Sequence, residues 1–189
     1  NNDRGIIGRV GIAIEITDRK ETEDNLRKSE IRYRKLFEFA RDAIMTLNPP
    51  AWRFTSGNPT IIKMFKVKNE AEFIRLTPWR LSPRYQPDGQ LSSKKAREMI
   101  EIAMQRGFNY FEWNHRRLNG EVFPATVALT RVELKEGNFL QATVRDISRE
   151  KRVEKALRES EELYRNLYET SLAALWRTRR SDGKSLKAN

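Results

Sequence analysis

The sequence predicts an α+β domain with a long charged helix on each side of it. Three observations support this fold class. The spacing of the apolar residues changes from a helical to a strand period near residue 43, and returns to a helical period near residue 148. Between these positions, two strand patterns are followed by helical patterns and then by three more strand patterns. Nearly the same amphipathic helix occurs before and after this block.

Composition excludes several kinds of protein and of site. The 189 residues are 38% hydrophobic and 33% charged, which is typical of a folded domain with much exposed helix. No apolar run approaches the roughly 18 residues that span a bilayer, so no membrane contact is expected within this chain. The sequence has no Cys, which excludes disulfides, thiolate metal sites and a covalent flavin–cysteine adduct. Its single His excludes a metal site built from several histidines.

The net charge of +11 raises nucleic-acid binding as an alternative function. The stretches 1–45 and 149–176, which contain the two predicted long helices, are nearly balanced in charge, and more than a third of the excess lies in 177–189. No predicted element combines a basic stripe with interleaved aromatic residues. We therefore interpret the charge as a solvated surface and expect no nucleic-acid partner.

The N-terminal segment 5–17, GIIGRVGIAIEIT, is apolar and β-branched, and predicts a strand. Its glycines are followed by more strand rather than by a helix, so they do not form a dinucleotide-binding loop. A helix is expected from about Asp18 to Arg41, with Thr17 or Asp18 as its N-cap. Apolar residues three, four and seven apart give this helix one apolar face.

The block between the long helices begins with two strands around a Pro-Pro turn. A short helix follows, for which Asn58 is the expected N-cap. A second short helix leads to the irregular stretch 77–92, and a loop of this length with aromatic residues is typical of a functional segment. A longer helix is expected to begin at Ser92 or Ser93 and to be stopped by Gly107.

Three strands end the block, joined by the predicted hairpin turns Asn119-Gly120 and Glu136-Gly137. Alternate residues of each strand are mostly apolar and are expected on one face of the sheet. These are Phe111, Trp113 and His115 in the first strand, Phe123, Ala125, Val127 and Leu129 in the second, and Leu140, Ala142 and Val144 in the third.

The charged helix is written twice, as RKSEIRYRKLFEFA at 27–40 and as RESEELYRNLYETS at 158–171, at an offset of 131 residues. A fixed period that carries a whole domain predicts a tandem array. The predicted organisation is the last strand of a preceding unit at 1–17, a connecting helix at 18–42, a complete core at 43–148, a second connecting helix at 149–172 and the first strands of a following unit at 173–189.

Three stretches resemble the PAS domain family. The tripeptides EIT at 15–17 and DIS at 146–148 each lead into a charged helix that ends S-E-x-x-Y-R-x-L, and FEWNHRRLNGEVFPATVALTRV at 111–132 resembles the family's hairpin. The resemblance implies a five-stranded antiparallel sheet with short helices on one face, often around a pocket, and flanked by signalling helices. It is typical of bacterial and archaeal proteins with several PAS units.

The resemblance implies a cytoplasmic sensory or signal-relay module of a signal-transduction protein. Its flanking helices would pair as coiled coils in a homodimer and pass a signal to neighbouring PAS units and an output domain of the same chain. Such output domains include the histidine kinase of a two-component system and diguanylate cyclases. This sequence contains neither the motifs of a histidine kinase nor those of a diguanylate cyclase, so we expect no enzyme activity from it. The alternatives are a basic nucleic-acid-binding fragment and a dimerisation spacer without ligand.

A small-molecule pocket is expected between the sheet and the helices, with a solidly packed core as the alternative. The candidate pocket residues are Trp79, Tyr85, Met99, Trp113, His115 and Thr126. His115 alone offers a haem ligand, but WxHRRxxG resembles an ordinary strand-and-turn pattern of the family, which disfavours haem. Non-covalent flavin beside the aromatic residues stays open, although such residues are more often core. The cofactor, if one exists, is therefore not identified.

The residues Asp146, Ile147 and Ser148 occupy the family's D-I-T position. The resemblance implies that their side chains tie the last strand to the outgoing helix. Ser148 is also an ordinary helix N-cap, and the two roles are compatible.

Overall fold

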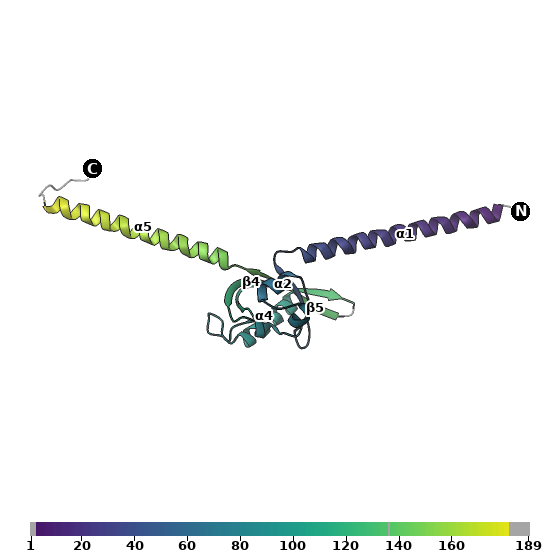
Figure 1. Cartoon of the computed structure of the whole chain (residues 1–189), viewed down its shortest axis with the longest axis horizontal. Coiled ribbons are helices and arrows are strands. Elements are labelled where there is room, and N and C mark those ends of the chain that lie inside the picture. Colours follow the sequence, from purple (N-terminus) through teal and green to yellow (C-terminus); the bar gives the residue numbers. More distant parts are fainter. Residues whose placement is uncertain (1–2, 136, 182–189) are drawn as a thin grey trace. The chain divides into compact units, whose positions relative to one another are not determined.

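The computed structural model describes residues 3–135 and 137–181, and the side chains of 19–135 and 137–170. Its contacts divide the chain after Asp146 into two units, which are considered separately. The first unit contains α1 (Asp3–Glu38) and an α+β core, and the second contains α5 (Ser148–Ser181) (Figure 1).

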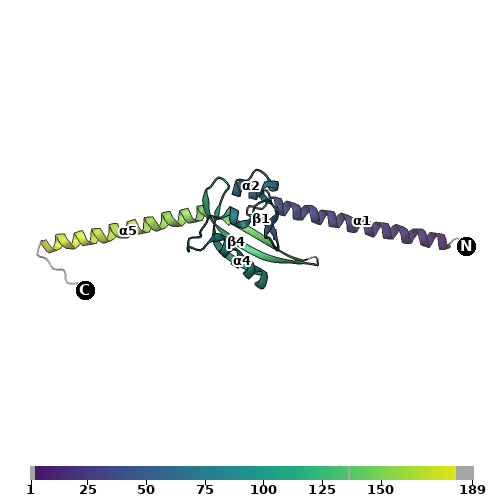
Figure 2. The same ribbon diagram turned by 90° about the horizontal axis from the view of Figure 1, so that it is seen from below.

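The core is built on one antiparallel sheet (Figure 2). Its five strands lie in the order β2-β1-β5-β4-β3. Its strands are β1 (Ala43–Asn48), β2 (Arg53–Gly57), β3 (Phe108–Arg116), β4 (Val122–Leu134) and β5 (Gly137–Asp146). The predicted fold class is therefore confirmed. Because β1 pairs with β5, the start of the first strand lies beside the end of the last one, with Ala43 opposite Val144.

Short helices cover one face of the sheet: α2 (Thr60–Phe65), α3 (Glu70–Phe73), the 3-10 helix η1 (Pro78–Leu81) and α4 (Ser92–Arg106). The hydrophobic core lies between these helices and the sheet. Its largest fully buried apolar side chains are Phe65, Phe73, Phe123, Met45 and Leu47. The predicted strand faces are confirmed, since burial alternates along β3, β4 and β5 with the expected residues inward.

Two predicted glycine positions have the backbone that a glycine favours. Gly107 ends α4 at φ 86°, and its N–H donates to the carbonyl of Ala103. Gly120 lies at φ 92° in the turn between β3 and β4, where its N–H donates to the carbonyl of Arg117. Both positive φ angles lie in a region that side chains with a Cβ rarely adopt.

The sequence predicted Asn58 as the N-cap of α2, and this prediction is wrong. Pro59 occupies the N-cap position. The Asn58 carboxamide is fully buried and makes tertiary hydrogen bonds instead. Its Oδ1 accepts from the N–H of Ile44 at 3.0 Å. Its Nδ2 donates to the carbonyls of Phe37 at 3.1 Å and Asp42 at 3.0 Å. Asn58 thus fastens the end of α1 to the start of β1.

The predicted serine cap of α4 is also wrong, because Leu91 occupies the N-cap position and no side chain caps the helix. Ser92 is the first helical residue, and its hydroxyl accepts a hydrogen bond from Gln86 Nε2 at 2.8 Å. The Ser92 hydroxyl therefore bonds to the buried Gln86 side chain and does not cap the helix, although local sequence rules predict a cap.

The chain is helical over the described part of both segments that were expected to supply strands to other units. α1 begins at Asp3, so the strand predicted within 1–17 is absent, and its end at Glu38 is slightly earlier than expected. α5 continues through residue 181, and residues 182–189 lie outside the described part. The described sheet has no strand that pairs with either segment. A helix satisfies its backbone groups locally without such a partner.

Candidate functional site

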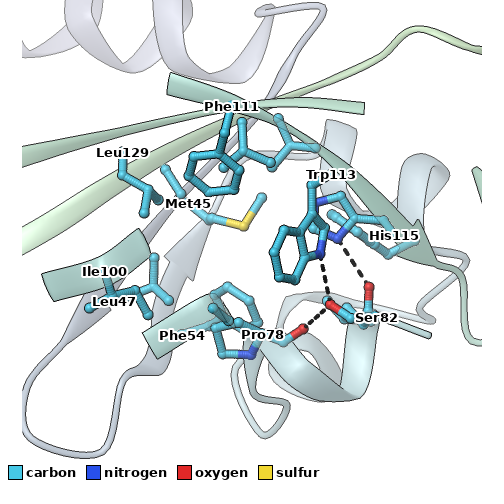
Figure 3. Close-up of a pocket in the computed structure, with 16 residues that line it drawn as sticks. Met45, Leu47, Phe54, Pro78, Ser82, Ile100, Phe111, Trp113, His115 and Leu129 are labelled. Carbon is cyan, nitrogen blue, oxygen red and sulfur yellow. Dashed lines mark hydrogen bonds between the residues drawn. The ribbon is translucent and has the colours of Figure 1, made fainter. Parts of the chain in front are cut away.

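A small cavity lies inside the core, between the sheet and the helices α2, η1 and α4 (Figure 3). Its wall is almost entirely apolar, with Phe65, Ile100 and Phe111 among the side chains that contribute to it. The cavity volume is about 60 Å³. This is several times the ~10–15 Å³ that a cavity needs to hold one water molecule. The site can therefore hold a very small molecule without rearrangement.

The indole of Trp113 is fixed at the polar edge of this cavity. Its Nε1 donates to Ser82 Oγ at 3.0 Å, and that hydroxyl in turn donates to the carbonyl of Pro78 at 2.9 Å (Figure 3). Ser82 follows η1 directly, so this chain of hydrogen bonds joins β3 to the 3-10 helix. Trp113 and Ser82 are both buried.

His115 also lines the cavity, and its hydrogen bond identifies its tautomer. Its Nδ1 lies 3.0 Å from the carbonyl oxygen of Leu81. A carbonyl only accepts, so Nδ1 carries the proton and Nε2 carries a lone pair in the neutral ring. The ring packs edge-on against Phe65 at 5.3 Å and stacks on Phe123 at 5.7 Å.

Burial lowers the pKa of His115 from its usual 6.5 to about 4. The carbonyl of Leu81 and the negative charge of Asp146 act in the opposite direction, but burial in this aromatic environment has the larger effect. His115 is therefore neutral at physiological pH.

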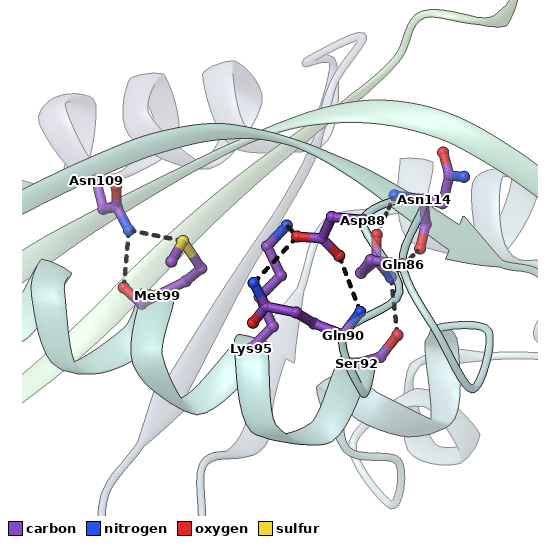
Figure 4. Close-up of polar contacts among 8 residues, drawn as sticks. All are labelled: Gln86, Asp88, Gln90, Ser92, Lys95, Met99, Asn109 and Asn114. Atoms are coloured by element: carbon purple, nitrogen blue, oxygen red, sulfur yellow. Dashed lines mark hydrogen bonds and ion pairs between the residues drawn. The ribbon is translucent and has the colours of Figure 1, made fainter.

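The loop between η1 and α4 is clamped to β3 by the side chain of Gln86 (Figure 4). Gln86 Oε1 accepts from the N–H of Asn114 at 2.9 Å, while Nε2 donates to the Asn114 carbonyl at 3.1 Å. This carboxamide therefore pairs with the strand as another strand would. Outside the clamp, Lys95 donates to Asp88 at 2.6 Å, and this hydrogen bond lowers the pKa of the exposed carboxyl group.

Arg117 joins three elements at the end of β5. Its Nη2 lies 2.6 Å from Asp146 Oδ2, and its Nη1 donates to the carbonyl of Met64 near the end of α2. Its Nε lies 3.1 Å from Glu121, and the guanidinium carbon lies 3.9 Å above the ring centre of Phe123. Because the guanidinium is largely shielded from water, this arrangement holds Asp146 more firmly than an exposed ion pair would.

A second ion pair joins the two ends of the core. Arg145 donates to both carboxylate oxygens of Asp42, with Nη2 2.8 Å from Oδ2 and Nε 3.1 Å from Oδ1. Asp42 immediately precedes β1, and Arg145 is the penultimate residue of β5. The first and last strands of the core are therefore joined, close to its two ends, by a side-chain ion pair.

The sequence profile of the PAS domain family matches residues 41–149, which is more than half of the chain. The chain belongs to the PAS domain family. A PAS domain of an HTR-like protein from Haloarcula marismortui has 20% identity and a TM-score of 0.56, covering 68% of this chain and 99% of that one. A PAS domain from a two-component sensor histidine kinase has 19% identity and a TM-score of 0.51, covering 64% and 98%. A PAS domain from Colwellia psychrerythraea has 14% identity and a TM-score of 0.53, covering 62% and 96%.

At these identities the solved structures establish the PAS fold and no more. No curated protein gives a significant match. Among the described residues there is no group of His, Asp and Glu that suits a metal ion, and no helix long and apolar enough to cross a membrane.

Two of the six predicted pocket residues, Trp113 and His115, line the PAS cavity. The other four are placed elsewhere. Trp79 is half-buried beneath the guanidinium of Arg97, and Tyr85 is half exposed. Met99 packs against the rim of the core. Thr126 lies on the opposite face of β4 from Ala125 and Val127, because strand side chains alternate.

Sequence reasoning missed several residues that form the cavity or its loop. Nothing in the sequence distinguishes Phe65 from the other apolar residues of its short helix. Ser82 and Gln86 lie in the irregular stretch 77–92, where no periodic pattern predicts the direction of a side chain. The length and aromatic content of that stretch were the only signal that it mattered.

The pKa of His115 predicts a pH-dependent stability. The folded protein disfavours the charged imidazole. The contribution of His115 to the free energy of unfolding is therefore complete above pH 6.5 and is lost as the pH falls from 6.5 towards 4. We expect the free energy of unfolding to be about 2 kcal/mol lower at pH 5 than at pH 7. Urea unfolding at both pH values measures this difference. In His115→Phe most of the difference should disappear; an unchanged difference would assign it to other groups.

Proposed function

We propose that this PAS core is a sensory or signal-relay module, in which occupation of the cavity or contact with a partner changes the position of β5. The main support for this proposal is that β5 contributes both to the cavity wall and to the junction with α5, which is Asp146, Ile147 and Ser148. Ala142 and Val144 of β5 line the cavity, and Asp146 of the same strand is held by Arg117. We infer that the module itself is non-catalytic and works in the cytoplasm.

The proposed path continues along the chain. Asp146 is followed by Ile147, and Ser148 begins α5. A shift of β5 would therefore reach the helix through this tripeptide, as the family's D-I-T position implies. A rigid strand transmits a small displacement to the element that follows it.

The flanking helices support a homodimer formed through coiled coils. Apolar residues spaced three, four and seven apart are more than half exposed in each helix, although such residues are usually covered. They are Leu26, Tyr33 and Leu36 in α1, and Val153, Leu157, Tyr164 and Leu167 in α5. We propose that a second copy of the chain covers them, and that the paired helices pass the signal to an output domain, such as a histidine kinase or a diguanylate cyclase.

The repeat at an offset of 131 residues supports a tandem array of such modules. In this proposal 18–42 and 149–172 connect neighbouring units around the core at 43–148. The segments 1–17 and 173–189 would become strands only when the sheets of those units supply a partner.

Native mass spectrometry of the intact chain tests the proposed assembly. We expect a dimer that carries the added mass of a small bound molecule. A bare dimer would favour the relay role over ligand sensing. A bare monomer would contradict pairing of the helices in this chain.

Two arginines allow a matched test of the junction. Arg117 and Arg131 each donate from Nη1 to a carbonyl near the end of a helix and each pair with a carboxylate, but only Arg117 contacts Asp146. We expect Arg117→Gln to speed amide exchange at 144–150 about tenfold, because a charge-assisted hydrogen bond is lost. Arg131→Gln should leave these amides unchanged. Equal effects of the two variants would contradict a specific role of Arg117.

A further inference from the structure

Nearly half of the chain's net charge lies on one segment that covers the cavity. Residues 75–97 contain six Lys and Arg but only one acidic residue, so they supply +5 of the chain's +11. The segment includes η1, the loop that follows it and the first two turns of α4. On its inner side, Pro78, Leu81, Ser82 and Ala96 line the cavity. The outer side of 75–97 is here termed the basic surface.

Most of the positive charge on the basic surface is unpaired. Five of the six cations are exposed, and none of these five forms an ion pair with a carboxylate of the described residues. They are Arg75, Arg80, Arg84, Lys94 and Arg97. The sixth cation, Lys95, lies 2.6 Å from Asp88 (Figure 4). The basic surface therefore offers several N–H donors and positive charges that the carboxylates of a partner can bind.

Two of the unpaired arginines are positioned by aromatic rings. The guanidinium carbon of Arg97 lies 5.4 Å from the ring centre of Trp79. That of Arg84 lies 5.4 Å from the ring centre of Tyr85. Tyr85 pairs with Leu91 in an isolated antiparallel bridge, and both side chains are nearly half exposed. Because the ring contact already restricts each guanidinium, less conformational entropy is lost when it binds a partner.

We propose that the basic surface docks an acidic segment of a protein partner. This inference rests on the proposed function and identifies the surface and the kind of partner for its relay role. Arg and aromatic residues are enriched in protein interfaces, whereas Lys is depleted there. Only one of the five unpaired cations is a Lys, and the exposed Tyr85 and Leu91 add apolar contact area beside the arginines. This composition favours a protein partner over a nucleic acid.

Docking on the basic surface would act on the same segment as occupation of the cavity. Ser82 accepts a hydrogen bond from Trp113 of β3, and Gln86 clamps the loop to Asn114 of the same strand. A partner that moves this segment from outside therefore changes the cavity wall from which β5 is reached.

A synthetic copolymer of glutamate and tyrosine is the probe for such a segment, and the fluorescence anisotropy of the labelled copolymer measures its binding to the intact chain. A protein of net charge +11 attracts any polyanion, so the comparison is made between variants of equal net charge. The double variant Arg80→Gln/Arg84→Gln removes two charges from the basic surface. Its matched control, Arg53→Gln/Arg106→Gln, removes two exposed charges from outside that surface. We expect the first variant to bind about fivefold to tenfold more weakly than the wild type, and the control less than about twofold.

Equal losses of affinity in the two double variants, or no binding of the copolymer to the wild type, would overturn the proposal. Tighter binding of a single-stranded polyuridylate of similar length would also overturn it and would assign the surface to nucleic acid. The amide NMR signals of Ile147 and Ser148 test the proposed function separately. If they stay unchanged while the copolymer saturates the basic surface, the docking surface stands and relay of a partner's contact to α5 fails.

Discussion

Replacing Phe65 with alanine is expected to lower the free energy of unfolding by about 4 kcal/mol. Phe65 is fully buried at the end of α2. Its ring lies 6.0 Å from those of Phe73 and Phe123 and 5.3 Å from that of His115, between ring centres. Truncation removes these contacts and enlarges an existing cavity, because the surrounding rings are held by other elements and cannot fully close the space.

Urea unfolding measures this loss, with Phe108→Ala as the matched control. Phe108 is 53% exposed at the start of β3, so the same truncation there should cost less than about 1 kcal/mol. Equal losses in the two variants would show that Phe65 is not part of the packed centre of the PAS core.

Replacing Asn58 with alanine has the second largest expected effect, a loss of about 3 kcal/mol. The change leaves the N–H of Ile44 and the carbonyls of Phe37 and Asp42 without the partner that they have in a buried site. An unpaired buried backbone group is costly, and here three groups lose one side chain together. The end of α1 should also become less firmly attached to β1.

Asn69→Ala is the matched control for this prediction. Asn69 is exposed, and its side chain makes one local hydrogen bond, accepting from the N–H of Glu72 as the N-cap of α3. Its loss should cost about 1 kcal/mol. Chemical denaturation compares the two variants, and faster amide exchange at 37–44 should occur in Asn58→Ala alone. A smaller loss at Asn58 than at Asn69 would contradict the role assigned to the buried carboxamide.

Elements governed by local chemistry were predictable from the sequence. The Asn119-Gly120 turn and the helix stop at Gly107 require positive φ angles at the glycines, and the structure has them. The alternation of residues along the last three strands likewise placed Trp113 and His115 on the inner face, and hence in the cavity wall. These features depend only on nearby residues.

The errors have a common physical origin in contacts that are distant in sequence. Asn58 has the residue type of an N-cap, but it bonds to groups that precede it by up to 21 positions. Ser92 is drawn into the Gln86 clamp, which also engages Asn114 of β3. The strand predicted within 1–17 stays a proposal, because it needs a neighbouring strand that the described sheet does not provide. Local pattern carries no information about such partners.

The central claim, that occupation of the cavity moves β5 and the start of α5, is tested most directly by amide NMR spectra under xenon. The predicted result is a saturable change at cavity residues such as Leu129 that extends through Val144 to Ile147 and Ser148. In Arg117→Gln the change at the amides of Ile147 and Ser148 should differ from that in the wild type, because the ion pair between Arg117 and Asp146 is lost. Changes confined to the cavity wall, with Ile147 and Ser148 unaffected at saturation, would contradict the claim.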